Sequence, residues 1–97
     1  MPTYVGLFRY TQKGIETIKE GPKRTDAAKK AVEAVGGKVV GLYLTMGQYD
    51  AVVIAEFPDD ETAAKVILAG ASQGNMRSET LRAFTEEEYR RIIAALP

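Results

Sequence analysis

The sequence has 97 residues, which is the length of one domain, so we expect residues 1–97 to fold as a single unit. Thirteen Lys and Arg residues balance thirteen Asp and Glu residues, and this zero net charge disfavours nucleic acid as a partner. The chain has no Cys and no His, which excludes thiolate nucleophiles, disulfides, thiolate zinc sites and imidazole bases. No segment approaches the roughly 18 consecutive apolar residues of a membrane span, so we expect a soluble, cytoplasmic protein with no membrane partner.

The first part of the chain predicts a strand followed by two helices. Residues 4–10 are rich in aromatic and branched side chains, as a strand requires. The aromatic residues that share one side of this strand are Tyr4, Phe8 and Tyr10. A short capped helix is predicted from Thr11, and a longer helix begins near Lys23 and ends at Gly36-Gly37. The apolar stripe of the longer helix comprises Ala28, Ala31, Val32 and Val35.

Two β-rich runs, residues 38–46 and 51–57, flank the short loop Gly47-Gln48-Tyr49-Asp50, and this pattern predicts a hairpin. Both sides of these strands are apolar. In the first run, strict alternation places Val39, Gly41 and Tyr43 opposite Val40, Leu42, Leu44 and Met46. In the second run, it places Ala51, Val53, Ala55 and Phe57 opposite Val52 and Ile54.

The last part of the chain predicts a helix, a strand and a terminal helix. Residues 58–61 supply a turn and the acids that favour a helix start. The apolar positions of that helix are Ala63, Val66, Ile67 and Ala71. Residues 75–84 predict a fourth strand, and Thr85 is the expected N-cap of a final helix with Glu88 at the capping-box position. The apolar face of the final helix comprises Tyr89, Ile92, Ile93 and Leu96.

The order β-α-β-β-α-β plus a terminal helix is that of the α+β ferredoxin-like sandwich, in which helices cover one face of a four-stranded antiparallel sheet. The other face should be polar if water covers it, yet both sides of these strands are apolar. Either the twist and edges of the sheet hide some of these residues, or a partner covers the face. The simplest partner is a second copy, so we expect a dimer packed sheet to sheet.

Several motifs resemble those of the GYD-domain family over nearly the whole chain. They are Gly47-Gln48-Tyr49-Asp50, Pro58-Asp59-Asp60, the run from Gly74 to Thr85, Gly14-Ile15, Pro22-Lys23-Arg24 and Gly36-Gly37-Lys38-Val39. The resemblance implies a ferredoxin-like fold of the dimeric α/β-barrel kind and brings no established reaction. From Met46 to Leu81 the chain is also similar, more distantly, to the effector-binding domain of the leucine-responsive regulator family. Those domains bind amino acids between subunits, so this likeness implies a ligand-binding module, here without their DNA-binding helix-turn-helix.

The candidate ligand site is centred on the hairpin. The residues expected to form it are Gly47, Tyr49, Asp50, Tyr10, Tyr43, Asn75 and Arg77. Asp50 either fixes the turn by accepting backbone N–H groups, or binds an amine or acts as a general base if burial raises its pKa. Tyr49 either packs its ring or donates a phenolic hydrogen bond to the ligand. The strand aromatics either fill the core or line a cavity; they are Tyr4, Phe8, Tyr10 and Tyr43.

Three arginines are the cations expected near the sheet. Arg9, Arg77 and Arg82 are either solvated or paired with Glu79 and Glu56 across strands, or one of them holds a carboxylate with both of its donors. These alternatives differ in whether the guanidinium groups already have an acidic partner in the folded chain.

Other polar segments carry weaker predictions. Asn75 either ends the preceding helix in left-handed backbone geometry or contacts a ligand. The basic run over residues 23–30 is interspersed with acids and predicts a solvated helix face. The acids at 59–61 complement the helix dipole and need no ion, so we expect no metal and no cofactor.

Two function classes fit the sequence best. The preferred one is a homo-oligomeric module that binds a small metabolite near Gly47 to Asp50, at the subunit boundary. The alternative is a small cofactor-free oxygenase or isomerase of the dimeric α/β-barrel type, which needs Asp50 or a tyrosine with a strongly shifted pKa. The chain has no recognisable catalytic constellation, which favours the non-enzymatic class. A purely structural subunit would instead have a tightly filled interface.

Overall fold

The computed structural model describes all 97 residues. Its elements in chain order are β1 (Thr3–Tyr10), α1 (Gln12–Glu16), the 3-10 helix η1 (Ile18–Glu20), α2 (Gly21–Ala34), β2 (Lys38–Leu44), β3 (Ala51–Glu56), α3 (Asp60–Ala71), β4 (Met76–Ala83) and α4 (Glu86–Ala94). The predicted element order is confirmed. α2 begins before the expected Lys23, because Pro22 lies in its first turn, where a missing backbone N–H costs no helical hydrogen bond.

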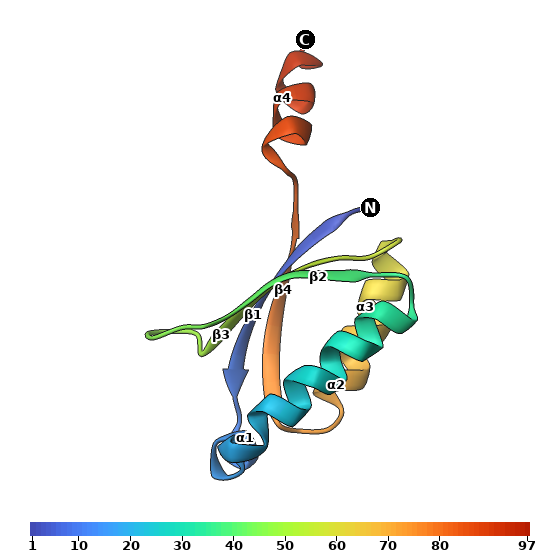
Figure 1. The fold of residues 1–97 in the computed structure, drawn as a ribbon. Coiled ribbons are helices and arrows are strands. Elements are labelled where there is room, and N and C mark those ends of the chain that lie inside the picture. The colour runs from blue at the N-terminus through green and yellow to red at the C-terminus, as the bar shows by residue number, and fades with distance from the viewer.

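The sheet has four antiparallel strands in the order β2-β3-β1-β4. This is the ferredoxin-like arrangement, so the predicted fold class is confirmed. α2 and α3 lie on one side of the sheet and leave its other side uncovered (Figure 1). None of the helices combines the length and apolar character needed to cross a bilayer.

The buried core lies between the sheet and one end of the helix layer. Its members are Tyr4, Val32, Ala55, Phe57 and Ala63. The rings of Tyr4 and Phe57 meet edge to face, with centroids 5.6 Å apart. The Tyr4 hydroxyl donates a hydrogen bond to Asp60 at the start of α3 and so ties β1 to that helix. Burial, together with this carboxylate, raises the pKa of Tyr4 to about 12.

A β-bulge in β2 corrects the predicted faces of that strand. Val39 pairs with Ala55, but the next pair along is Gly41 with Ile54, so Val40 is the extra residue. Beyond the bulge, Leu42 and Leu44 share the helix-facing side with Val39, while Gly41 and Tyr43 lie on the uncovered side. Strict alternation cannot reveal an inserted residue, and the predicted grouping of Val39 with Gly41 and Tyr43 is therefore wrong.

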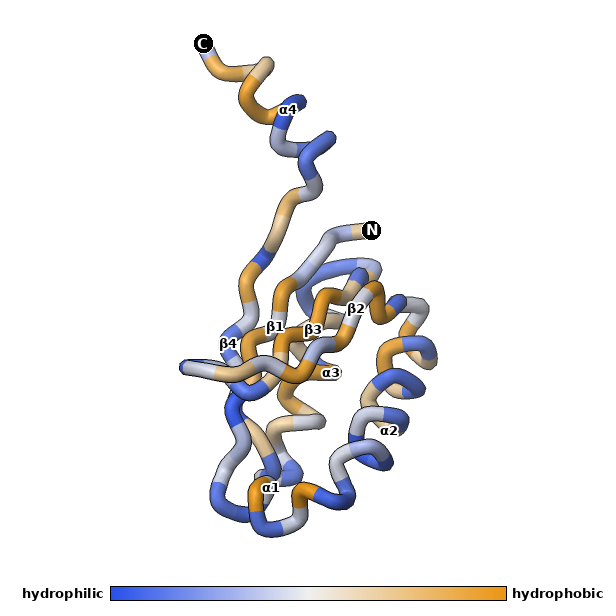
Figure 2. The backbone as a smooth tube through the Cα atoms, turned by 60° about the vertical axis from the view of Figure 1, so that its left-hand side comes forward, coloured by the Kyte–Doolittle hydropathy of each residue, from blue (hydrophilic) through white to orange (hydrophobic).

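The uncovered side of the sheet, called the open sheet face below, is apolar at its centre. Its apolar residues are Val5, Leu7, Tyr43, Val52, Ile54 and Leu81. Val5 lies between Ile54 and Leu81 in the strand register. Figure 2 shows the matching concentration of hydrophobic residues in the central strands β1 and β3. The prediction that both sides of the strands are apolar is confirmed, whereas the sheet-to-sheet dimer stays a prediction.

α4 forms as predicted but does not pack on the rest of the chain. Thr85 Oγ1 accepts a hydrogen bond from the Glu88 backbone N–H at 3.2 Å, and Glu88 Oε1 accepts one from the Thr85 N–H at 2.9 Å. Hydrogen bonding of the Glu88 carboxylate to Thr85, chiefly to its backbone N–H, lowers the pKa of Glu88. The helix projects away from the sheet and from the other helices (Figures 1 and 2). Its exposed apolar residues are Tyr89, Ile92 and Ile93, and the exposed Leu96 follows the end of the helix.

Candidate functional site

The hairpin between β2 and β3 is closed by its own polar groups. Thr45 donates its backbone N–H to the Asp50 carbonyl at 2.9 Å and its hydroxyl to the Tyr49 carbonyl at 2.7 Å. Gly47 has a φ of 127°, a backbone region that other residues rarely adopt. A Cβ at this position would meet nothing within 4 Å, so backbone conformation alone demands the glycine.

Asp50 fastens the hairpin to the end of β1. Its backbone N–H donates to the Phe8 carbonyl at 2.8 Å, and its Oδ2 accepts the Tyr10 backbone N–H at 2.9 Å. The carboxylate thus accepts a backbone N–H group, as the turn-fixing interpretation has it, but the donor lies on β1 and not within the loop. A ligand role for Asp50 stays a prediction.

Tyr49 lies within a cluster of polar side chains at the hairpin end of the open sheet face. The guanidinium carbon of Arg9 is 4.7 Å from the centroid of the Tyr49 ring, a cation–π contact. Arg9 Nε also donates to the Gln48 carbonyl at 2.9 Å. The Tyr49 hydroxyl donates to Glu79 Oε2 at 3.1 Å, and chiefly this hydrogen bond raises the pKa of Tyr49.

Arg77 lies directly opposite Arg9 in the pairing of β1 with β4. The ion pairs of the chain are Lys23–Glu20, Lys65–Glu61 and Arg90–Glu86, so neither Arg9 nor Arg77 has a carboxylate within 4.0 Å. Of the alternatives considered for these two arginines, pairing with a glutamate is therefore wrong, while a solvated guanidinium group and a bound carboxylate both stay predictions. Like charges directly opposite each other on neighbouring strands are destabilising. This pair is consequently a place where an added anion would be stabilised.

A groove of about 700 Å³ opens beside this cluster, along the edge strand β4. Arg9, Tyr49, Arg77 and Glu79 line it, and Ile67 of α3 contributes to its apolar wall. We call it the hairpin groove. Its two guanidinium groups outnumber its single carboxylate, so the groove is suited to an anion.

The structure brings only some of the predicted site residues together. Tyr49 and Arg77 line the hairpin groove, and Gly47 and Asp50 shape the adjoining loop. The predicted residues outside the groove lining are Tyr10, Tyr43 and Asn75. Tyr10 follows Phe8 on the helix-facing side of β1, and Tyr43 lies over Gly41 on the strand β2, at the other edge of the sheet.

Asn75 lies between the helices and the sheet. Its backbone carbonyl accepts the Thr11 N–H at 3.1 Å, and the residue lines a second cavity, beside α2 and α3. The proposal that Asn75 adopts left-handed backbone geometry is wrong, since Gly74 has the positive φ of 80°. A Cβ on Gly14 would lie 2.0 Å from the Asn75 carbonyl oxygen, so glycine is required there by close approach.

Sequence reasoning named Arg9 only as a cation near the sheet and missed Glu79 as a member of the groove. Alternation along β4 puts Arg77 and Glu79 on one side, and alternation along β1 separates Arg9 from Tyr10. That pattern could have placed these residues on one face. Their apposition with Tyr49 depends on strand register and on how the hairpin folds back, which alternation does not specify.

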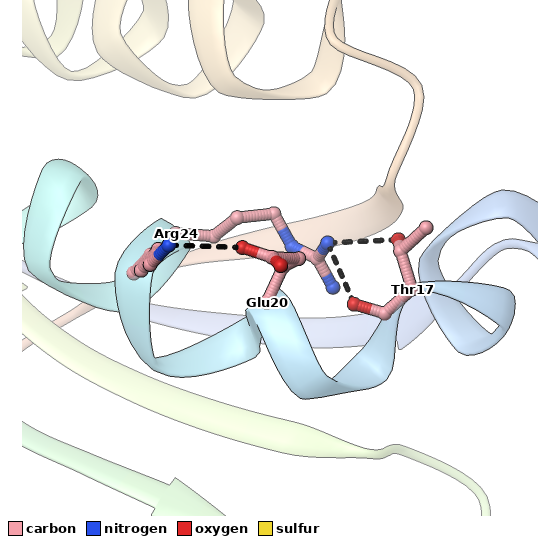
Figure 3. Close-up of polar contacts among 4 residues, drawn as sticks. Thr17, Glu20 and Arg24 are labelled. Atoms are coloured by element: carbon pink, nitrogen blue, oxygen red, sulfur yellow. Dashed lines mark hydrogen bonds and ion pairs between the residues drawn. The ribbon is translucent and has the colours of Figure 1, made fainter.

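The basic run on α2 is more than a solvated helix face. Arg24 reaches back to Thr17, donating to its carbonyl at 3.2 Å and to its hydroxyl at 3.0 Å (Figure 3). It also donates to the Gly14 carbonyl at 3.2 Å, so it holds the α1 segment against α2. Lys23 makes an exposed ion pair with Glu20 at 3.6 Å. The prediction is thus correct for Lys23 and incomplete for Arg24.

Comparison with known proteins gives matches to both the sequence and the fold. The family model of the GYD domain matches residues 4–93. A glutamine synthetase and cystathionine beta-lyase binding protein from Thermus thermophilus is 36% identical over 84 residues, which cover 86% of this chain and 88% of that protein. The crystal structure of TTHA0845, also from Thermus thermophilus, is similar at 28% identity and a TM-score of 0.56, over 88% of this chain and 95% of that chain.

Two further solved structures resemble the fold. The leucine response regulatory protein of Mycobacterium tuberculosis has 12% identity and a TM-score of 0.56, over 87% of this chain and 51% of that chain. SnoaB, a cofactor-independent oxygenase from Streptomyces nogalater, has 16% identity and a TM-score of 0.54, over 87% of this chain and 91% of that chain. At such identities the likeness concerns the fold alone.

Proposed function

Because the chain belongs to the GYD-domain family, we propose that it is a homo-oligomeric module that binds a small carboxylate in the hairpin groove, at the boundary with a second copy. The observation that carries this proposal is the apposition of Arg9 and Arg77 without an acidic partner. A bound carboxylate accepts hydrogen bonds from guanidinium groups and relieves their mutual repulsion.

Two apolar surfaces without a partner in the chain support the oligomer. The open sheet face presents Val5, Leu7 and Ile54 at its centre, and α4 presents its own apolar side. Sheet faces of this kind pack on one another at about 10 Å in two-layer proteins. Charges of both signs, Lys38 and Glu56 among them, occur on the same face, so a two-fold arrangement can place opposite charges together.

A covering second copy would strengthen the groove as a binding site. Removal of water lowers the local dielectric constant, which makes each hydrogen bond from Arg9 or Arg77 to an anion stronger. The Tyr49 hydroxyl donates its one proton to Glu79, so the hydrogen bonds to the anion come from the guanidinium groups. The α3 wall suits a ligand with an apolar part next to its carboxylate.

Native mass spectrometry tests the oligomer. We expect the purified protein to have the mass of a dimer or a larger multiple, and Ile54→Lys to convert it to monomer, because that change places an ammonium group at the centre of the open sheet face. Ile18→Lys is the matched control, since Ile18 is exposed on η1, outside the sheet. A wild-type monomer would contradict the proposal.

Titration calorimetry at low ionic strength tests the ligand, with acetate, benzoate and phenylacetate as probes. We expect benzoate to bind and Arg77→Gln to weaken its binding about tenfold or more, which is a loss of about 1.4 kcal/mol. Arg91→Gln on α4 is the matched control, because it removes the same charge outside the groove. The proposal fails if no probe binds, or if Arg77→Gln binds benzoate as tightly as the wild type does.

A second candidate function is docking to an enzyme. It is favoured by the Thermus relative, which is named as a binding protein of glutamine synthetase and cystathionine beta-lyase. By this likeness the chain would bind glutamine synthetase of its own organism through the exposed side of α4, which carries Ile92. Co-sedimentation of the two purified proteins tests it, and Ile92→Asp should abolish the complex whereas Arg90→Gln should not. Independent sedimentation of the wild type would refute this candidate.

No comparable observation favours the cofactor-free enzyme. The likeness to the oxygenase SnoaB, at 16% identity, concerns the fold. The pKa is raised for both Tyr4 and Tyr49, so both hydroxyl groups stay protonated at neutral pH. Neither phenol can serve as a general base there.

A further inference from the structure

A cavity of about 660 Å³ separates the helix layer from the sheet. It lies on the side of the sheet opposite the open sheet face, between α2, α3 and the helix-facing residues of all four strands. In a protein of this fold the space between the layers is where a hydrophobic core is expected. Here the five buried hydrophobic residues occupy only part of it.

Several of the helix residues that line the cavity are small. The alanines and glycine that line it from the helices are Ala27, Ala28, Ala31, Ala34, Ala69, Gly70 and Ala71. On the sheet, Gly6 lies under the ring of Phe8, and a Cβ on Gly6 would be 2.5 Å from that ring. Most of these helix residues are exposed, so the space is open to solvent between the two helices and the sheet. Its volume lies within the range of about 300–1,000 Å³ that small-molecule sites span.

The charges around the cavity are all of one sign. Lys23, Arg24 and Lys29 of α2 and Lys65 of α3 line it, while none of the thirteen acids of the chain does. The guanidinium of Arg24 already donates to carbonyl and hydroxyl groups of the α1 segment. The lysines have long apolar stems with mobile ammonium groups, and Lys23 and Lys65 make only exposed ion pairs with neighbours close by in the sequence. The rim of the cavity is thus cationic and adaptable.

The wall formed by the start of β4 adds neutral polar groups. Asn75, Ser78 and Thr80 line the cavity beside the apolar residues of β1 and β3. Asn75 was predicted from the sequence to contact a ligand, and its place here suits that role better than the hairpin groove does. The cavity therefore combines an apolar interior, a few neutral hydrogen-bonding groups and a cationic rim.

We infer that this cavity binds an amphipathic carboxylate, with its apolar body between the helices and the sheet and its carboxylate held by Lys29 and Lys65 at the rim. The ammonium groups supply the charge complementarity, and the alanine-lined interior supplies the volume. The site is complete within one chain, so it goes beyond the proposed function and does not require a second copy.

Decanoate is a suitable probe, with decanol and decyltrimethylammonium as neutral and cationic counterparts. By titration calorimetry we expect decanoate to bind at least about tenfold more tightly than decanol, and the cation not to bind. The double variant Lys29→Gln with Lys65→Gln should remove the preference for decanoate while leaving decanol binding unchanged. Lys19→Gln on η1 is the control, because Lys19 does not line the cavity. If the protein binds decanoate and decanol with equal affinity, the inference that Lys29 and Lys65 hold a carboxylate is overturned.

Ala28→Phe tests the location by filling the cavity. We expect it to abolish decanoate binding while circular dichroism shows a retained fold, and Ala31→Val, a smaller filling change, to weaken binding less. Saturating benzoate, the probe of the hairpin groove, should leave decanoate binding unchanged, which separates this site from that groove. Undiminished binding by a folded Ala28→Phe variant, or loss of decanoate binding at saturating benzoate, would overturn the inference.

Discussion

Replacement of Asp50 by Ala separates the two roles considered for this residue. In the structure Asp50 Oδ2 accepts the Tyr10 backbone N–H at 2.9 Å, and the Asp50 backbone N–H donates to the Phe8 carbonyl at 2.8 Å. The substitution removes the first hydrogen bond and leaves the second. The hairpin would then be held to β1 by backbone contacts alone, with the half-buried Tyr10 N–H lacking an acceptor.

The expected loss follows from this geometry. A hydrogen bond to a charged group contributes about 1.5–3 kcal/mol to stability, and water can reach part of this region, so we expect the lower end, about 1.5 kcal/mol. For a domain of this size, that loss lowers the midpoint of thermal unfolding by about 6–12 °C. Asp50→Asn keeps an oxygen acceptor and loses only the charge, so it should cost about 0.5–1 kcal/mol.

Urea unfolding at pH 7, followed by circular dichroism, measures these differences. Asp26→Ala is the control, because Asp26 is a residue of α2 outside the hairpin, and its loss should change stability by less than about 0.5 kcal/mol. The reasoning is refuted if Asp50→Ala unfolds at the wild-type urea concentration. If such a variant also loses benzoate binding, Asp50 is a ligand residue and not a structural one.

Three further predictions concern other parts of the chain. Gly14→Ala should destabilise the protein by at least about 2 kcal/mol, because its Cβ would lie 2.0 Å from the Asn75 carbonyl oxygen, and an unchanged melting temperature would contradict this contact. Absorbance titration should show Tyr4 ionising near pH 12. Because its pKa is raised on folding, its stabilising effect is complete below pH 10.0 and is lost as pH rises from there toward 12, and Tyr4→Phe should remove this part of the alkaline loss of stability. The pKa of Glu88 is lowered on folding, so its contribution to α4 should be present above the ordinary value of 4.5 and lost as pH falls below it. Glu88→Gln, which has no titrating carboxylate, should remove this acid sensitivity from the α4 amide signals in nuclear magnetic resonance spectra.

The sequence was sufficient to predict those features that depend on interactions between residues close together in the chain. The capping box of Thr85 and Glu88 acts within one helical turn, and the apolar stripe of α2 repeats every turn, so both could be recognised without tertiary information. The predicted element order and the ferredoxin-like fold follow from such signals. The bulge at Val40 could not be predicted, because its position is set by how β2 pairs with β3. The hydrophobic pattern of β2 does not show which residue is the extra one.

The candidate site likewise contains residues that could be predicted from the sequence and contacts that could not. Tyr49 and Arg77 could be named from the sequence as polar residues near the sheet, but their meeting with Arg9 and Glu79 depends on strand register and on the fold of the hairpin. Asp50 was recognisable as a residue that satisfies backbone groups, whereas its partner, the Tyr10 N–H, is 40 positions away. Contacts between distant residues have no local periodicity from which they could be inferred.

The sequence by itself determined the order of strands and helices, the caps, the fold class and the apolar character of both sheet faces, because propensity, capping and periodicity act over a few residues. The tertiary structure alone decided that Arg9 faces Arg77, that α4 stands away from its own chain, and that alanines on α2 and α3 leave a cavity above the sheet. Each of these depends on the distance and orientation between whole elements. Those are set by packing across the layers and not by any neighbouring residue.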